Sequence, residues 1–182
     1  MYRFNLNFVY PTTVSGNTVT SSSPTQSLAV TTLLPASPKI TAQPIPTWSL
    51  PSMHEPSTNM MVVEDASKPA DVRFLHVLQA TDAGVAPAAA LLMTGTVAGG
   101  GAAHGALFGS TAVLFVTAPP SGGVTSITCS LPAGSAAPTS VYATGLMPGA
   151  SYQLTNSGGV VGVVMGGGAG SIQTDSAGVA SF

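Results

Sequence analysis

The sequence predicts an all-β protein, and three observations lead to that fold class. Helix-breaking residues recur throughout, with 21 glycines and 15 prolines in 182 residues. Between them lie short runs rich in valine, threonine and isoleucine, at a spacing of roughly ten residues that is typical of all-β domains. The third observation is the run Leu146-Met-Pro-Gly-Ala-Ser-Tyr152, which has the pattern of a tyrosine corner. We therefore expect a two-sheet antiparallel sandwich of the immunoglobulin or jelly-roll kind, with at least about nine strands and an extended N-terminal arm.

Residues 1–34 are predicted to form this N-terminal β arm. Residues 2–10 alternate, so that Phe4, Leu6 and Phe8 share one face. That apolar face must be buried, either on the same fold or on another copy, which makes these three residues a candidate assembly strand. A strand at 27–34 follows the hairpin turn Ser15-Gly-Asn-Thr18, in which Gly16 and Asn17 are expected to supply the positive φ.

Residues 35–59 are predicted to be a proline-rich connector, and residues 60–182 the sandwich itself. Six prolines fall between Pro35 and Pro56, which leaves room only for an edge strand at 39–42. Residues 73–81 are mostly apolar on both faces, so we expect this strand, and above all Phe74–Leu78, to lie inside the sandwich. The other predicted strands are 60–63, 89–94, 103–107, 112–116, 126–131, 140–143, 151–155 and 159–165, followed by a final hairpin in which Asp175–Gly178 turn residues 171–174 back into 179–182.

Charge is scarce and unevenly placed. Only 5% of residues are charged, none lies between Ala83 and Thr174, and six of the ten fall between Val62 and Gly84. A formal net charge of -2 creates no field that could hold a polyanion. We therefore expect no nucleic-acid partner and no acidic polysaccharide gripped by a basic groove, while repulsion between copies is weak.

The histidines and glycines show no motif that carries chemistry. His54, His76 and His104 have no second ligand at metal spacing, and His76 is best explained as a hydrogen-bonded core residue. Gly166–Gly170 indicates a flexible tip, because no phosphate-binding motif surrounds it. We expect neither a metal nor a cofactor.

The carboxylates do not form an obvious catalytic pair either. Residues Glu55, Glu64, Asp65, Asp71 and Asp82 are candidates for glycosidase chemistry, which needs two carboxyl groups around a sugar bond. In a turn-rich segment they are better explained as solvated turn residues or as partners of Lys68 and Arg73. No serine lies in a recognised nucleophile motif, so no catalytic residue is nominated.

The remaining conspicuous side chains also have structural explanations. Leu146, Pro148, Gly149 and Tyr152 form the predicted tyrosine corner, in which the hydroxyl bonds the backbone a few residues upstream. Cys129 is the single cysteine, and its alternating surroundings predict a small buried apolar side chain. Five aromatic residues could stack on a sugar, but core packing is preferred for them, namely Trp48, Tyr2, Tyr10, Tyr142 and Tyr152.

The sequence also carries information about cellular location. The N-terminus is not a signal peptide, because its apolar residues alternate with polar ones and Pro11 comes too early. No stretch reaches the roughly 18 apolar residues of a membrane helix, so no membrane span is expected. We expect a secreted, extracellular protein whose targeting segment is absent from this chain.

Four stretches together resemble a known family. They are Thr13–Thr20, Leu28–Pro38, Arg73–Gln79 and Ala106–Phe115, and in this order they resemble the C-terminal β-domain of secreted heparinase II/III-like polysaccharide lyases. The resemblance covers nearly the whole chain, and its motifs are mostly strand and turn residues. In that family, lyase chemistry depends on residues carried largely by a helical toroid, and this sequence has no toroid.

The resemblance thus implies a non-catalytic accessory or structural β-domain of an exported polysaccharide-degrading protein. Its partners would be an upstream catalytic domain, a polysaccharide that it holds weakly, or both. The alternative is a structural subunit that self-assembles into an extracellular fibre or sheath by strand exchange, with copies of itself as partners.

Overall fold

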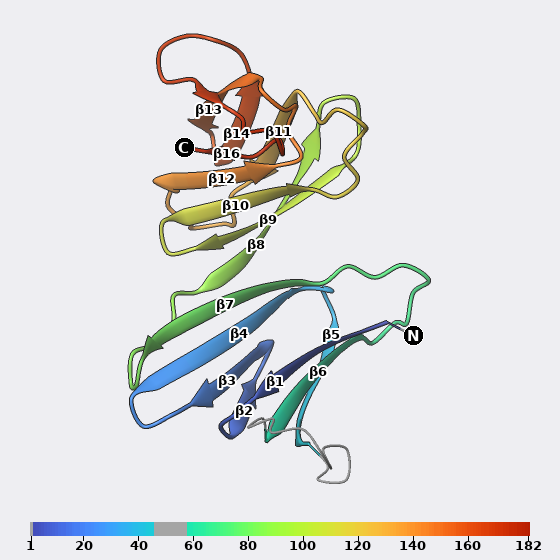
Figure 1. Ribbon diagram of the computed structural model, residues 1–182, viewed down its shortest axis with the longest axis vertical. Coiled ribbons are helices and arrows are strands. Elements are labelled where there is room, and N and C mark those ends of the chain that lie inside the picture. The colour runs from blue at the N-terminus through green and yellow to red at the C-terminus, as the bar shows by residue number, and fades with distance from the viewer. Residues whose placement is uncertain (1, 46–57) are drawn as a thin grey trace. The chain divides into compact units, whose positions relative to one another are not determined.

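The structure, a computed structural model, describes residues 2–45 and 58–182. The backbone of these residues forms strands, turns and loops but no helix, which confirms the all-β prediction (Figure 1). Accordingly, the described residues contain no helix long and apolar enough to cross a membrane. The chain divides into two compact units, Met1–Ala88 and Ala89–Phe182, which we call the first and second units.

The first unit contains two antiparallel sheets. Sheet A has the order β1-β6-β5, and sheet B has the order β2-β3-β4-β7. Apolar side chains of both sheets share one core, which includes Phe8 and Met61 from sheet A and Val19 and Val30 from sheet B. The strands are β1 Arg3–Phe8, β2 Thr12–Ser15, β3 Thr18–Ser22, β4 Gln26–Leu34, β5 Pro38–Pro44, β6 Asn59–Asp65 and β7 Leu75–Asp82.

The second unit is one sheet, sheet C, with the order β15-β13-β14-β11-β8-β9-β10-β12-β16. All its neighbours are antiparallel except β10 and β12. The two ends of the order, β15 and β16, are joined by residues 174–179, so the sheet nearly closes on itself. Its strands are β8 Ala90–Val97, β9 Ala102–Phe108, β10 Thr111–Val116, β11 Ser126–Ser130, β12 Ser140–Thr144, β13 Ser151–Ser157, β14 Val160–Met165, β15 Ile172–Gln173 and β16 Ala180–Ser181.

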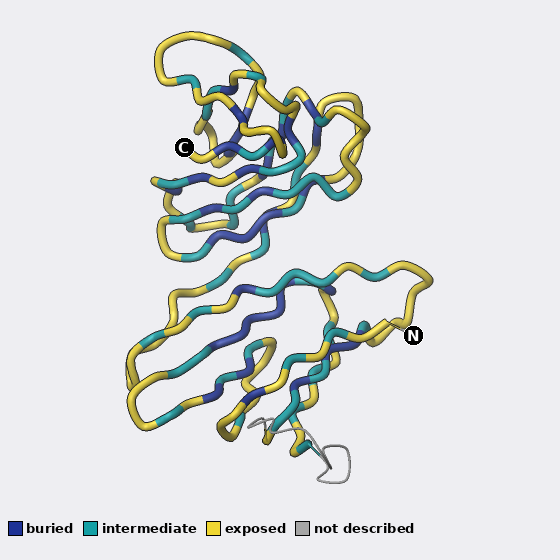
Figure 2. Tube along the Cα trace, in the orientation of Figure 1, coloured by how far each residue is buried: buried dark blue, intermediate teal, exposed yellow. Residues whose placement is uncertain are grey.

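A two-sheet arrangement therefore describes the first unit and not the second. The inward residues of sheet C surround a core of their own, which includes Met93, Leu114, Ile127 and Tyr152. Figure 2 shows that most buried positions lie within the strands, whereas the turns are mostly exposed. A curved nine-stranded sheet can enclose its core without a second sheet. Inward and outward side chains alternate along its strands just as they do in a two-sheet sandwich, so this pattern does not distinguish the two folds.

The predicted division of the chain maps onto these units as follows. Residues 1–34 include the first four strands of the first unit, and residues 35–59 include β5. Residues 60–182 contain the rest of the first unit and the whole second unit, so the boundary between compact units falls after Ala88.

The first hairpin turn lies where the sequence predicts it, between β2 and β3. The backbone conformation of its second residue, however, differs from the prediction. Gly16 has a φ of 57°, whereas Asn17 does not have a positive φ. Instead, the Asn17 side-chain amide donates a hydrogen bond to the Thr32 carbonyl at 2.7 Å, and its own carbonyl accepts one from the Thr32 N–H at 2.8 Å. Asn17 thus connects the turn to β4.

The prediction that residues 73–81 lie inside a sandwich is wrong. This segment forms β7, which is the end strand of sheet B and pairs only with β4 in the described residues. Val77 is buried, but Leu78 is 52% exposed. An apolar residue on each face does not by itself show that both faces are covered, because coverage depends on the neighbouring strands.

The prediction of a C-terminal hairpin is right about the turn but wrong about the strand pairing. Its turn is present, because the Gly178 N–H bonds the Asp175 carbonyl at 3.1 Å and Gly178 has a φ of 72°. However, β15 pairs with β13, and β16 pairs with β12. The two short strands join opposite ends of sheet C instead of pairing with each other.

Candidate functional site

The first unit has an open flank, formed by the end strands β1 and β7. In the described residues β1 pairs only with β6, and β7 only with β4. The ladder places Leu78 beside Val30, a core residue, so Leu78 lies on the core-facing side of sheet B and is nevertheless 52% exposed. On the other flank, β2 and β5 lie next to each other. The three strands of sheet A thus leave part of the four-stranded sheet B uncovered.

A shallow groove of about 360 Å³ lies on this flank. We call it the flank groove. Its apolar part includes Phe8, Leu28 and Ala80, and Tyr10 is 46% exposed at its side. No charged side chain lines it. The full lining is Asn7, Phe8, Val9, Tyr10, Ser21, Ser23, Gln26, Ser27, Leu28 and Ala80.

Most hydroxyl groups of the flank groove already have hydrogen-bond partners. Ser21 donates to the Tyr10 carbonyl at 3.1 Å, and Ser27 shares a 2.8 Å bond with Ser22. Ser23 closes the turn before β4 with a bond to the Gln26 carbonyl at 3.2 Å. These bonds hold the end of β1 against the β3–β4 hairpin and give the groove its shape.

Two side chains of β7 bond the chain that follows this strand. Gln79 Nε2 donates to the Ala88 carbonyl at 2.8 Å, and the Thr81 hydroxyl donates to the Val85 carbonyl at 3.0 Å. Residues 85–88, which include Pro87, therefore run back along this strand.

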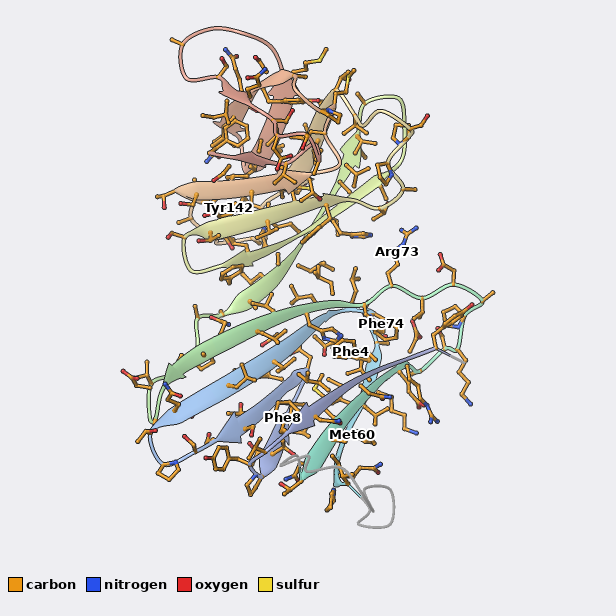
Figure 3. The ribbon with its side chains drawn as sticks, in the orientation of Figure 1. Phe4, Phe8, Met60, Arg73, Phe74 and Tyr142 are labelled. Atoms are coloured by element: carbon orange, nitrogen blue, oxygen red, sulfur yellow. The ribbon has the colours of Figure 1, made fainter. Side chains whose placement is uncertain are left out.

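Two phenylalanines and a histidine form a cluster at the other end of β1. The ring of His76 has its centroid 4.0 Å from that of Phe4 and is stacked with Phe74 at 6.2 Å. Phe4 and Phe74 lie near each other (Figure 3), with ring centroids 6.2 Å apart. His76 Nδ1 shares a 3.1 Å hydrogen bond with the Thr32 hydroxyl, while its buried Nε2 has no partner among residues 2–45 and 58–182. Burial lowers the pKa of His76 from 6.5. The half-buried ring thus favours the neutral form.

Three carboxylates, Glu64, Asp65 and Asp175, take part in local structure. Glu64 is buried and forms an ion pair with Arg3 across the β1–β6 ladder. Asp65 accepts hydrogen bonds from the Ser67 N–H and hydroxyl, at 2.8 and 2.6 Å. Asp175 accepts two backbone N–H bonds within the turn before β16. No group of three or more potential metal ligands occurs in residues 2–45 and 58–182.

Tyr152, on β13, is fully buried in the core of the second unit. Its hydroxyl accepts a hydrogen bond from the Met147 N–H at 3.0 Å, five residues upstream, and donates one to the Val124 carbonyl at 2.5 Å. The Thr174 hydroxyl donates to the Met147 carbonyl at 2.7 Å. The Leu146–Tyr152 segment is thereby connected to two distant loops, and Leu146 itself is buried.

The other sequence-nominated side chains are dispersed. Cys129 is buried in the second unit, and burial raises the pKa of its thiol to about 11, which favours the neutral thiol. His104 lies on β9, and its buried Nδ1 has no hydrogen-bond partner in the described part of the chain. Core packing was expected for all the tyrosines but holds only for Tyr152, since Tyr2, Tyr10 and Tyr142 are 58%, 46% and 43% exposed. Trp48, His54 and Glu55 lie outside the described residues.

The candidate assembly strand packs within its own chain in this structure. Phe8 is buried in the first core, and Phe4 and Leu6 pack against it. The flank groove beside this strand was not predicted from the sequence. The available signal was the apolar face Phe74, His76 and Leu78 of residues 73–81, which the sequence predicts to lie inside the sandwich.

The chain was compared with protein families and with curated proteins. No protein-family model matches the chain. A search of curated proteins found no match either.

Proposed function

We propose that this chain is a non-catalytic β-module that accompanies the catalytic domain of an exported polysaccharide-degrading protein. The observation that supports the proposal is that several side chains with potential chemical roles take part in holding the fold together. Glu64 is paired, Asp65 and Asp175 hold turns, and Cys129 is buried. General acid–base chemistry needs groups that can reach a substrate, and these groups are already occupied by the fold.

The two-sheet first unit is the part that we propose to be the sandwich expected from the sequence. Its flank groove offers Tyr10 and the side-chain amides of Asn7 and Gln26 on an uncharged surface. An aromatic ring and amides are suited to the C–H faces and hydroxyls of a neutral sugar. Glycan binding at this module is accordingly expected to be weak.

The activity test uses the purified 182-residue chain with heparin, heparan sulfate and alginate. We expect no unsaturated uronate product by ultraviolet absorbance, and retarded migration in gels that contain a bound polysaccharide. Tyr10→Ala should reduce that retardation, whereas Tyr2→Ala, which removes an exposed tyrosine away from the groove, should not. Product formation would exclude a non-catalytic module.

A self-assembling structural subunit is the second candidate. The observation that favours it is that β1 and β7 end their sheets in the described part of the first unit, together with a surface of few charges. Negative-stain microscopy and sedimentation at increasing concentration separate the two functions. Filaments support the structural subunit, whereas a monomer that binds glycan supports the accessory module.

A further inference from the structure

The flank groove is adjoined by a second hollow on the β4–β7 ladder, the strand pair that Figure 1 shows side by side. The second hollow has a volume of about 350 Å³ and is lined by Gln26, Ala80, Thr81, Asp82 and Val85. Gln26 and Ala80 also line the flank groove, so the two spaces are neighbours. Leu28 pairs with Ala80 in this ladder. Two residues further along, Gln26 pairs with Asp82, and alternation places both pairs on the same face of sheet B.

An acidic group gives this double space its only charge. Among the described residues that line the two spaces, Asp82 alone is charged. Its carboxylate is exposed and makes no ion pair or hydrogen bond within residues 2–45 and 58–182, and the same holds for the side-chain amides of Asn7 and Gln26. A ligand thus meets unused amide donors and acceptors, the exposed ring of Tyr10 and one carboxylate.

We propose that the flank groove and the second hollow together bind an amino-sugar oligosaccharide, with one ring on Tyr10 and an ammonium group on Asp82. This inference rests on the glycan-binding role proposed above and names the class of glycan. A carboxylate attracts an ammonium group and repels the carboxylates and sulfates of acidic polysaccharides. Amides donate to and accept from sugar hydroxyls, and the C–H face of a sugar packs on an aromatic ring.

The width of the site favours an oligosaccharide over a single sugar. Ser21, Leu28 and Ala80 form one row across β3, β4 and β7. Neighbouring strands lie about 4.8 Å apart, so this row is about 10 Å wide. Tyr10 is held at the β3 end of the row, because its carbonyl accepts the Ser21 hydroxyl at 3.1 Å. Asp82 lies beyond the β7 end, so one ligand must span more than one sugar ring to reach both.

The test compares glucosamine and N-acetylglucosamine oligosaccharides of equal length, titrated into the full chain at a pH that keeps the amine protonated. Acetylation removes the charge and keeps the ring and its hydroxyls. We expect the glucosamine form to bind about two- to fivefold more tightly, as an exposed ion pair allows, and this preference to shrink as salt is added. An alginate oligosaccharide should bind more weakly than either.

Three variants at exposed positions locate the site. Asp82→Asn should remove the preference for the amine form and leave binding of the acetylated form unchanged. Asp71→Asn removes the same charge from a residue that does not line the two spaces, and it should keep the preference. Tyr10→Ala should weaken binding of both oligosaccharides. Circular dichroism checks that each variant keeps the fold.

The outcomes separate this inference from the proposed function. Equal binding of the two oligosaccharides, or a preference that survives Asp82→Asn, overturns the inference and leaves a non-catalytic glycan-binding module in place. Binding of neither oligosaccharide also overturns it. Tighter binding of a trilysine peptide than of the glucosamine oligosaccharide would assign the groove to basic peptides and overturn it too. Release of unsaturated uronate product from an acidic polysaccharide would instead overturn the proposed function.

Discussion

At the scale of single residues, the fold depends on a few polar groups placed in apolar surroundings. Tyr152 is the clearest, because its hydroxyl both donates and accepts a bond to the backbone inside the second core. Buried polar groups in that position stabilise a fold mainly because removing one leaves its partners without hydrogen bonds.

Replacing Tyr152 by phenylalanine is expected to lower the free energy of unfolding by about 1–3 kcal/mol, since the Val124 carbonyl and the Met147 N–H lose their shared partner. Urea unfolding measures this change. The control is Tyr142→Phe, at a 43% exposed tyrosine, which should change stability by less than about 0.5 kcal/mol. Equal effects of the two variants would contradict the role given to the Tyr152 hydroxyl.

His76 should make the first unit sensitive to mild acid. Its pKa in the folded state is below 6.5, because burial disfavours the charged ring, so the folded state binds fewer protons than the unfolded state as the pH falls below 6.5. The free energy of unfolding is then highest above pH 6.5 and decreases as the pH is lowered toward the folded pKa. The inward residues of β1, β4 and β6 that surround this core carry no charge, and these are Phe4, Leu6, Phe8, Leu28, Val30, Thr32, Met61 and Val63.

Proton NMR titration of the full chain measures this pKa directly, and His76→Gln assigns the signal. The same variant should flatten the dependence of stability on pH just below 6.5. A measured pKa at or above 6.5 would show that the ring is more hydrated than the structure indicates.

At the scale of elements, close strand pairing in sheet C depends on small residues. Gly95 on β8 faces β11, and a Cβ atom there would overlap the Thr128 carbonyl oxygen. This position requires glycine because another backbone approaches it, not because of its own φ.

We therefore expect Gly95→Ala to destabilise the second unit by about 1–3 kcal/mol, as overpacking does when neighbouring backbone cannot move away. Gly166→Ala is the matched control, because nothing lies within 4 Å of a Cβ built there and its φ is not positive. Thermal unfolding compares the two. A wild-type melting temperature for Gly95→Ala would mean that β8 and β11 can separate at little cost.

At the scale of the whole molecule, the two units have separate cores. We therefore expect a mutation in one core to destabilise its own unit and not the other. Phe8→Ala removes a 4% exposed ring from the first core. We expect it to lower the free energy of unfolding of the first unit by about 3–5 kcal/mol. Deleting residues 1–12 removes β1 altogether and should unfold the first unit. Val9→Ala, at a 46% exposed position, is the control and should have little effect.

Native-state hydrogen exchange reads out both units in one experiment. Phe8→Ala should reduce protection in β3 and β4 while β11 and β14 remain as protected as in the parent chain. Loss of protection in all four strands would show that the chain unfolds as one cooperative unit.

The sequence by itself determined the all-β class, most strand positions and the turns at Gly16 and Gly178. These follow from local chemistry, namely alternation, β-propensity and the positive φ that glycine permits. Tertiary structure alone decided that sheet C nearly closes, that β15 and β16 pair elsewhere, and that β7 ends a sheet with Leu78 uncovered. Alternation shows which side chains share a face, but backbone hydrogen bonds between distant strands decide which faces are neighbours, and every backbone carries the same donors and acceptors.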